Sequence, residues 1–107
     1  MVSLKGFEAA LLRDFGPRTE LERVLVHALR RGAGGRVYLM LMPDDALWLV
    51  GTRAGAPAGG AVLLELAAPG APVEDALLDL RVRVIDWRSS ERRYDALMAR
   101  RARRPMP

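Results

Sequence analysis

The most constraining feature of this chain is a pair of short apolar runs on either side of a Pro-Asp turn. Val37 to Met42 is an unbroken apolar run, and after Pro43-Asp44-Asp45 a second run covers Ala46 to Val50. Two such runs around a turn predict a β-hairpin. Because neither run alternates apolar with polar residues, both faces of the hairpin must be covered. The sequence therefore predicts helices on both sides of the sheet, or a partner subunit over one side.

The remaining periodicities predict helices before the hairpin and further strands after it. Apolar residues recur at helical spacing over 3–15 and again over 21–29, where T-x-x-E from Thr19 to Glu22 indicates a capping box. A third strand is expected over 61–67 and a short helical segment over 73–79. Val82 and Val84 alternate with arginines, so residues 81–87 are expected to form a fourth strand.

These elements predict an α+β fold. The sheet is expected to be small, mixed, mostly antiparallel and four-stranded, flanked by helices in the order α-α-β-β-β-(α)-β-α. The 107 residues fit a single domain, 1–107, in which 88–107 forms a basic C-terminal helix and tail beginning its helix near Ser89 or Ser90. Trp48 and Trp87 lie in or beside predicted strands and are expected to pack in the core.

The composition excludes several kinds of chemistry and indicates a cellular setting. Cysteine is absent and His27 is the only histidine, which excludes thiolate chemistry and a multi-histidine metal site within one subunit. No apolar run reaches the roughly 18 residues that span a bilayer, and no signal-peptide pattern is seen, so a cytoplasmic location without membrane contact is expected. The lack of Asn and Gln and the excess of Arg over Lys suggest a GC-rich, thermophilic source.

Positive charge is concentrated at the end of the chain. Residues 1–87 hold ten Lys and Arg against eleven Asp and Glu, whereas 88–107 hold seven Arg against Glu91 and Asp95. At 100° per residue from Leu97, five arginines fall between about −140° and −20°, opposite Tyr94 and Met98. These candidate binding residues for a nucleic acid or another anion are Arg92, Arg93, Arg100, Arg103 and Arg104.

Two interpretations of these arginines stay open. Charges that add over one helix face suit a phosphate backbone or an acidic protein. Cations near a helix C-terminus are also favoured by the helix dipole alone, which would make the segment an ordinary solvated surface.

Acidic residues at two strand ends allow a catalytic alternative. Pro43-Asp44-Asp45 opens the second predicted strand, and Leu64-Glu65-Leu66-Ala67 closes the third. With this element order, residues 19–87 resemble the restriction-endonuclease-like core, in which a Pro-Asp and a downstream Glu-X-Lys hold a metal. The resemblance implies metal carboxylates at Asp44 or Asp45 and at Glu65, although Ala67 occupies the lysine position. As ordinary residues, the two aspartates would belong to the turn and Glu65 to an edge strand.

The sequence thus predicts a non-catalytic binding or regulatory module, without cofactor or metal, that contacts nucleic acid or an acidic protein partner through its arginine-rich C-terminal helix. A homo-oligomer is expected if a second copy covers one face of the sheet. The alternatives are a nuclease-fold protein of the restriction-endonuclease-like kind, active or inactive, and a structural subunit of a larger assembly.

Overall fold

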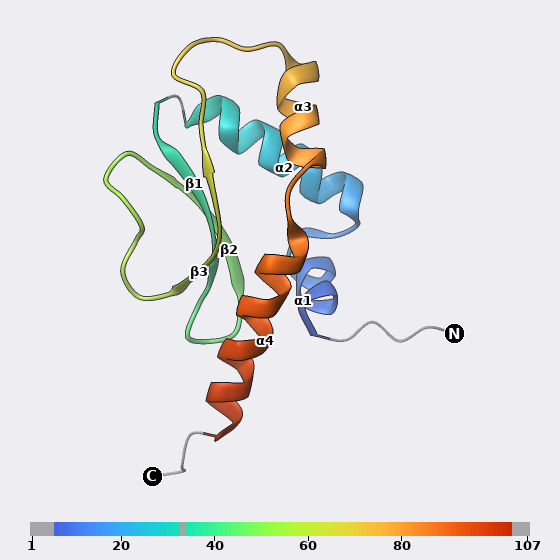
Figure 1. Cartoon of the computed structure of the whole chain (residues 1–107), viewed down its shortest axis with the longest axis vertical. Coiled ribbons are helices and arrows are strands. Elements are labelled where there is room, and N and C mark those ends of the chain that lie inside the picture. Colours follow the sequence, from blue (N-terminus) through green and yellow to red (C-terminus); the bar gives the residue numbers. More distant parts are fainter. Residues whose placement is uncertain (1–5, 33, 104–107) are drawn as a thin grey trace.

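The predicted hairpin forms the centre of a three-stranded antiparallel sheet. The computed structural model describes residues 6–32 and 34–103. The elements run in the order α1 (Gly6–Phe15), α2 (Arg18–Arg31), β1 (Arg36–Leu41), β2 (Leu47–Thr52), β3 (Ala61–Ala67), α3 (Asp75–Arg83) and α4 (Trp87–Arg103), as Figure 1 shows. The strand order is β2-β1-β3, with β1 antiparallel to both neighbours. The α+β class is therefore confirmed.

The Pro-Asp turn of the hairpin is also confirmed. The N–H of Asp45 donates to the carbonyl of Met42 at 3.0 Å, and the N–H of Met42 donates to the carbonyl of Ala46 at 2.8 Å. Asp45 itself lies in the left-handed region with φ of 69°. A turn followed by one left-handed residue is a common three-residue hairpin loop, in which glycine usually holds that position.

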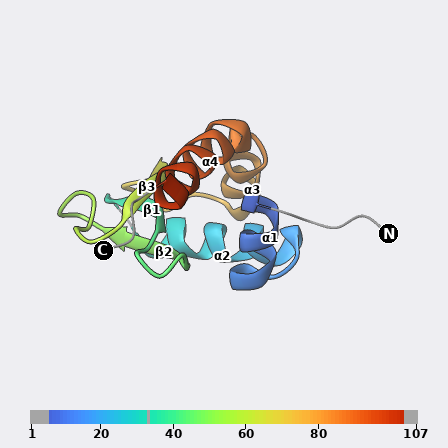
Figure 2. The same cartoon turned by 90° about the horizontal axis from the view of Figure 1, so that it is seen from below.

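The central strand β1 is buried on both faces, but helices cover only one of them. Val37, Leu39 and Leu41 belong to the apolar core that the sheet shares with the helices. Tyr38 and Met40 are equally buried but lie outside that core, on the opposite face. All four helices lie on one side of the sheet, while the loop between β2 and β3 lies on the other (Figure 2). Of the two predicted covers, helices on both sides is therefore wrong for the described residues, and a partner subunit over one side stays a prediction.

The opposite side of the sheet, which we call the outer face, is only partly covered. Gly60, at the end of the loop, lies against the side chains of Met40 and Met42. Trp48 pairs across from Met40 on this face and is 55% exposed, so its expected place in the core was also wrong. The helix layer cannot reach Trp48, because alternate residues of a strand point to opposite faces.

The fourth strand predicted over residues 81–87 is not formed. Residues 75–83 are helix α3, and α4 begins at Trp87. Leu78 and Val82 are buried and Ile85 packs against the core, a helical spacing of i, i+4 and i+7. Val84 is 72% exposed. Four alternating residues were too few to distinguish a strand from this helical stripe.

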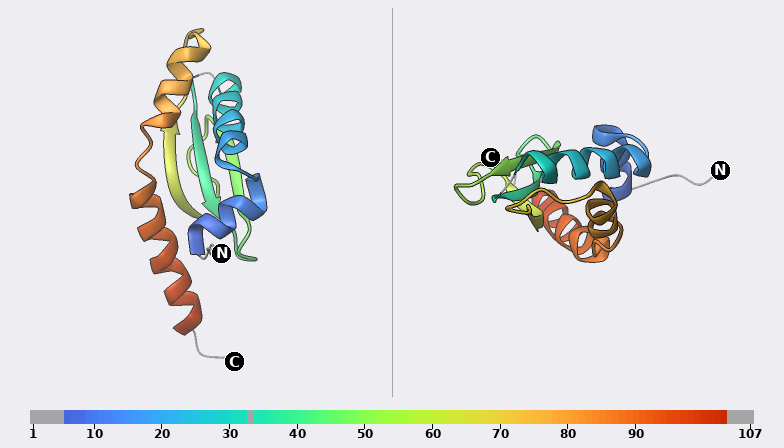
Figure 3. Two further views of the ribbon diagram at one scale, coloured as in Figure 1. Left: turned by 90° about the vertical axis from the view of Figure 1, so that its right-hand side faces the viewer. Right: turned by 90° about the horizontal axis from the view of Figure 1, so that it is seen from above.

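The helices cover the face of the sheet opposite the outer face, and they lie near different edges of it. α1 and α2 contact β2, whereas α4 runs beside β3 (Figure 3). The predicted stripe of α2 is confirmed by the burial of Leu21, Leu25 and Leu29. The capping box is not formed, because the helix begins at Arg18 and no side chain caps its N-terminus. Of the helices within 6–32 and 34–103, none is long and apolar enough to cross a membrane.

Two neighbouring valines test the helical assignment of α3. Val82 is 1% exposed and Val84 is 72% exposed, whereas a strand would bury both. We expect Val82→Ala to lower the free energy of unfolding by about 2 kcal/mol, the value of a buried valine side chain. Val84→Ala should change it by less than about 0.5 kcal/mol. Urea denaturation measures both variants, and equal losses would contradict the helix.

Candidate polyanion-binding surface

Helix α4 begins earlier than its sequence suggested, because Asp86 caps it. The backbone N–H of Ser89 donates to Oδ1 of Asp86 at 3.4 Å, and its hydroxyl donates to Oδ2 at 2.7 Å. The side-chain bond from Ser89 is the main reason that the pKa of Asp86 lies below its ordinary value. An aspartate before the first turn satisfies amide groups that the helix leaves open. The helix therefore starts at Trp87 and not at Ser89 or Ser90.

Aromatic packing fixes which side of α4 faces the core. The ring of Phe7 in α1 lies 5.4 Å from that of Tyr94 and 6.2 Å from that of Trp87, measured between centroids. The guanidinium of Arg18 stacks over Trp87 at 4.9 Å. Burial raises the pKa of Tyr94. Because these contacts hold one side of α4 against α1 and α2, the opposite side must face solvent.

The arginines predicted to point outward do lie on that solvent side. We call Arg92, Arg93, Arg100 and Arg103 the arginine surface, and all of them are exposed. Arg104, the fifth predicted residue, lies outside the described residues. Among residues 6–32 and 34–103, no carboxylate forms an ion pair with the arginine surface. Its charges are therefore not neutralised by a neighbouring side chain in the described part of the chain.

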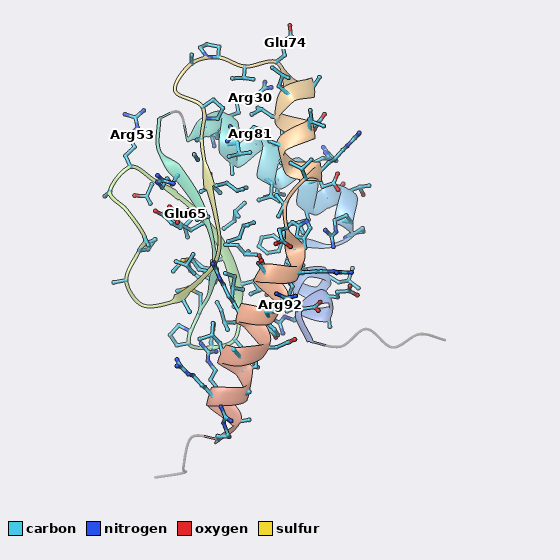
Figure 4. The ribbon with its side chains drawn as sticks, in the orientation of Figure 1. Arg30, Arg53, Glu65, Glu74, Arg81 and Arg92 are labelled. Atoms are coloured by element: carbon cyan, nitrogen blue, oxygen red, sulfur yellow. The ribbon has the colours of Figure 1, made fainter. Side chains whose placement is uncertain are left out.

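The members of the arginine surface are not equivalent. Arg93 donates from Nη1 to the carbonyl of Leu63 in β3 at 3.4 Å, so part of its hydrogen-bonding capacity serves the fold. Arg92 has no such bond among the described residues, and its charge makes a smaller contribution to the lowered pKa of Asp86. In Figure 4, Arg92 lies on α4, Glu65 on β3 and Arg53 on the loop after β2, on three separate elements. Arg92, Arg100 and Arg103 are thus the members most available to a ligand.

Sequence reasoning missed the role of Arg101. This arginine falls on the inner side of α4 and forms an ion pair with the carboxylate of Asp45 in the hairpin turn. Arg13 of α1 donates to the backbone carbonyl of Asp45 at 2.9 Å and pairs with Asp14. The bond from Arg13 lowers the pKa of Asp14, whose carboxylate also accepts the N–H of Leu47. On the helical wheel Arg101 lies about 40° from Leu97, on the same side as Tyr94 and Met98. This position could have predicted that Arg101 faces the fold.

The acidic residues of the nuclease alternative do not share a site. Asp44 accepts the N–H of Ala46 at 3.0 Å, and Asp45 pairs with Arg101. Glu65 lies opposite Tyr38 in the sheet and pairs with Arg36 at 2.9 Å. The hairpin turn begins at Met42, four residues after Tyr38. At 3.3 Å per residue, the turn therefore lies roughly 13 Å from the position of Glu65 along the sheet. In the part of the chain that the structure describes, no three such side chains could hold a metal.

His27 and the glycine-rich loop lie on elements other than α4. His27 is exposed on α2, as its place on the helical wheel predicts. The glycine-rich loop after β2 has positive φ at Gly55 and Gly59 and lies beyond the outer face (Figure 2). The end of this loop, at Gly59 and Gly60, lines a hollow together with Arg101 of α4.

Comparison with known proteins supplies no family and no relative for this chain. It matches no protein-family model, and no curated protein matches it significantly. Function must therefore be argued from the described residues themselves.

Asp45→Asn tests whether Asp45 holds the end of α4. Asparagine tolerates the left-handed backbone but cannot pair with Arg101, so we expect faster amide exchange over residues 98–103. Both side chains are partly exposed, at 28% and 48%, so the loss of stability should stay below about 1 kcal/mol. Asp44→Asn keeps the oxygen that accepts from Ala46 and is the matched control. Equal exchange in the two variants, measured by hydrogen–deuterium exchange, would show that the ion pair does not hold α4.

Proposed function

We propose that this protein is a binding module that contacts the phosphate backbone of a nucleic acid through the arginine surface of α4. The observation that carries the proposal is the exposure of these arginines without a paired carboxylate among the described residues. Guanidinium groups bind phosphate through paired N–H donors. Neutralising phosphates releases condensed counterions, which supplies much of the affinity.

The dimensions of α4 suit several adjacent phosphates. Arg92 and Arg103 are separated by eleven residues, which is roughly 16 Å at 1.5 Å per residue, and Arg100 lies between them. Asp45 and Arg101 hold this part of the helix against the hairpin, so the row does not depend on the end of the helix alone. A fixed row of charges loses less side-chain and backbone entropy on binding than a disordered tail would.

Binding by this surface should show little sequence preference. No aromatic residue lies between the arginines on the outer side of α4, so bases have nothing on which to stack. Contacts to phosphates position a nucleic acid without reading its bases. An acidic protein is the other polyanion that the arginine surface could bind. The binding test below distinguishes an acidic protein from a nucleic acid. A cytoplasmic setting in a heat-adapted organism is part of the proposal and rests on composition.

A triple substitution tests the arginine surface. We expect Arg92→Gln, Arg100→Gln and Arg103→Gln together to weaken binding of a labelled 20-base-pair DNA and of a single-stranded RNA. The slope of log affinity against log salt should become less steep by about 2.7 units on the duplex and about 2 units on the single strand, because roughly 0.9 and 0.7 counterions respectively are released per neutralised phosphate. Fluorescence anisotropy at several salt concentrations measures both quantities.

The matched control removes the same charge elsewhere. Three other exposed arginines lie on α2 and α3, away from α4, and their triple change to Gln should leave most of the affinity: Arg23, Arg31 and Arg83. Equal losses in the two triple variants would mean that net charge alone drives binding. No binding to DNA or RNA by the wild type at low salt, together with binding to poly-glutamate, would favour an acidic protein partner.

A second candidate function, as a structural subunit of a larger assembly, is favoured by a different surface. Three exposed apolar residues follow one another at i, i+3 and i+7 along the outer side of α3 and its C-cap: Leu77, Leu80 and Val84, which are 53%, 57% and 72% exposed. An apolar stripe at this spacing is typical of a helix that packs against another helix. This candidate needs a protein partner on α3 and does not involve the arginine surface.

A further inference from the structure

The outer edge of β2 carries backbone groups that the fold leaves open. Directly opposite residues in an antiparallel pair alternate between those that exchange hydrogen bonds and those whose groups point away. The bond from Met42 to Ala46 fixes this alternation, so that Leu47, Leu49 and Gly51 point away from β1. The N–H of Leu47 confirms it by donating to Asp14 at 2.8 Å. Within the described ranges, the outward groups of Leu49 and Gly51 have no partner.

The two edges of the sheet differ in how they are protected. The pairing of β3 with β1 shifts register between Leu39 and Met40, and β3 has a charged residue, Glu65. Helix α4 runs beside β3, and Arg93 donates to the carbonyl of Leu63. The sequence of β2 is LWLVGT, without a charge or a proline. Folded proteins normally block an exposed edge with such residues, because an open edge pairs with other chains. The open edge of β2 is therefore suited to pairing with a strand of another chain.

We propose that β2 pairs antiparallel with β2 of a second copy of this chain about a twofold axis at Val50. Leu49 then lies opposite Gly51 of the second copy, and Gly51 opposite its Leu49. These are the residues whose groups point outward, so each pair exchanges both backbone hydrogen bonds. An antiparallel strand paired with itself is an isologous contact that closes after two copies. This dimer is a specific form of the homo-oligomer expected from the sequence. The proposal does not depend on nucleic-acid binding.

Side chains on both faces fit this register. A Cβ built on Gly51 meets nothing within 4 Å, so space is open beside it for the facing Leu49. On the outer face, Trp48 would lie opposite Thr52 of the second copy and diagonal to its Val50. Such cross-strand neighbours are within reach of an aromatic ring. Pairing would thus bury Trp48, which is 55% exposed in one copy. A second copy accounts for both the open edge and the exposed tryptophan.

The self-paired position Val50 allows a charge-exchange test. In this register Val50 faces its own counterpart, so Val50→Lys or Val50→Glu places like charges directly opposite and opposes pairing. We expect wild type at tens of micromolar to have twice the monomer mass of 11.8 kDa by light scattering after size exclusion. Each variant alone should give the monomer mass. An equimolar mixture of the two variants should restore the dimer mass, because opposite charges then face each other.

Two controls keep the test decisive. Ala99→Lys places the same charge on an exposed position of α4, which lies beside the other edge of the sheet, and should leave the dimer intact. Circular dichroism of each Val50 variant must match that of wild type, which separates lost pairing from lost folding, and dimer recovery in the mixture shows the same thing directly. A monomeric wild type, a dimer that persists in Val50→Lys, or a mixture that stays monomeric would each overturn the proposal. A monomeric wild type whose β2 pairs with a strand of a different protein would also overturn the proposal, because the partner would not be a second copy.

Discussion

Burial of β1 on both faces is the constraint on which the rest of this structure depends. Five consecutive residues from Val37 to Leu41 are buried, yet the helices within residues 6–32 and 34–103 all lie on one side of the sheet. Val37, Leu39 and Leu41 therefore meet the helix layer, while Tyr38 and Met40 depend on neighbouring strands and on the loop that follows β2. That uneven coverage leaves Trp48 exposed and β2 with an open edge. The proposed second copy would complete the cover by extending the sheet, not by adding another layer.

The same arrangement decides where the arginines of α4 point. β3 is the other edge of the sheet, and α4 runs beside it with Tyr94 and Trp87 held against Phe7. Since those aromatic contacts fix the rotation of the helix about its axis, Arg92, Arg100 and Arg103 can only lie on the solvent side. The ion pair between Arg101 and Asp45 then joins the last turns of α4 to the hairpin. In the two proposals, the sheet edge at β3 supports the ligand surface and the sheet edge at β2 pairs with a second copy.

Sequence patterns predicted the elements with strong local signals and failed where long-range packing decides. The hairpin, the third strand and the buried stripe of α2 follow from runs and periods that few structures satisfy, and the outward side of α4 follows from helical geometry. The fourth strand was wrong because Val82 fits both the alternation with Val84 and the helical stripe with Leu78, and the packing of α3 against α2 selects the helix. The prediction that Trp48 packs in the core was wrong because its place in a strand does not show which face of the sheet the helices cover. Arg101 was overlooked because its partner, Asp45, lies far away in the chain.

The central proposal is that the outer side of α4, and not net positive charge in general, receives a polyanion. Mapping amide chemical shifts of the labelled protein during titration with a short DNA duplex tests this most directly. The shifts should concentrate at residues 92–103 and leave the loop after β2 and the exposed stripe of α3 unchanged. Shifts centred on those other surfaces, or spread evenly over every exposed arginine, would contradict it.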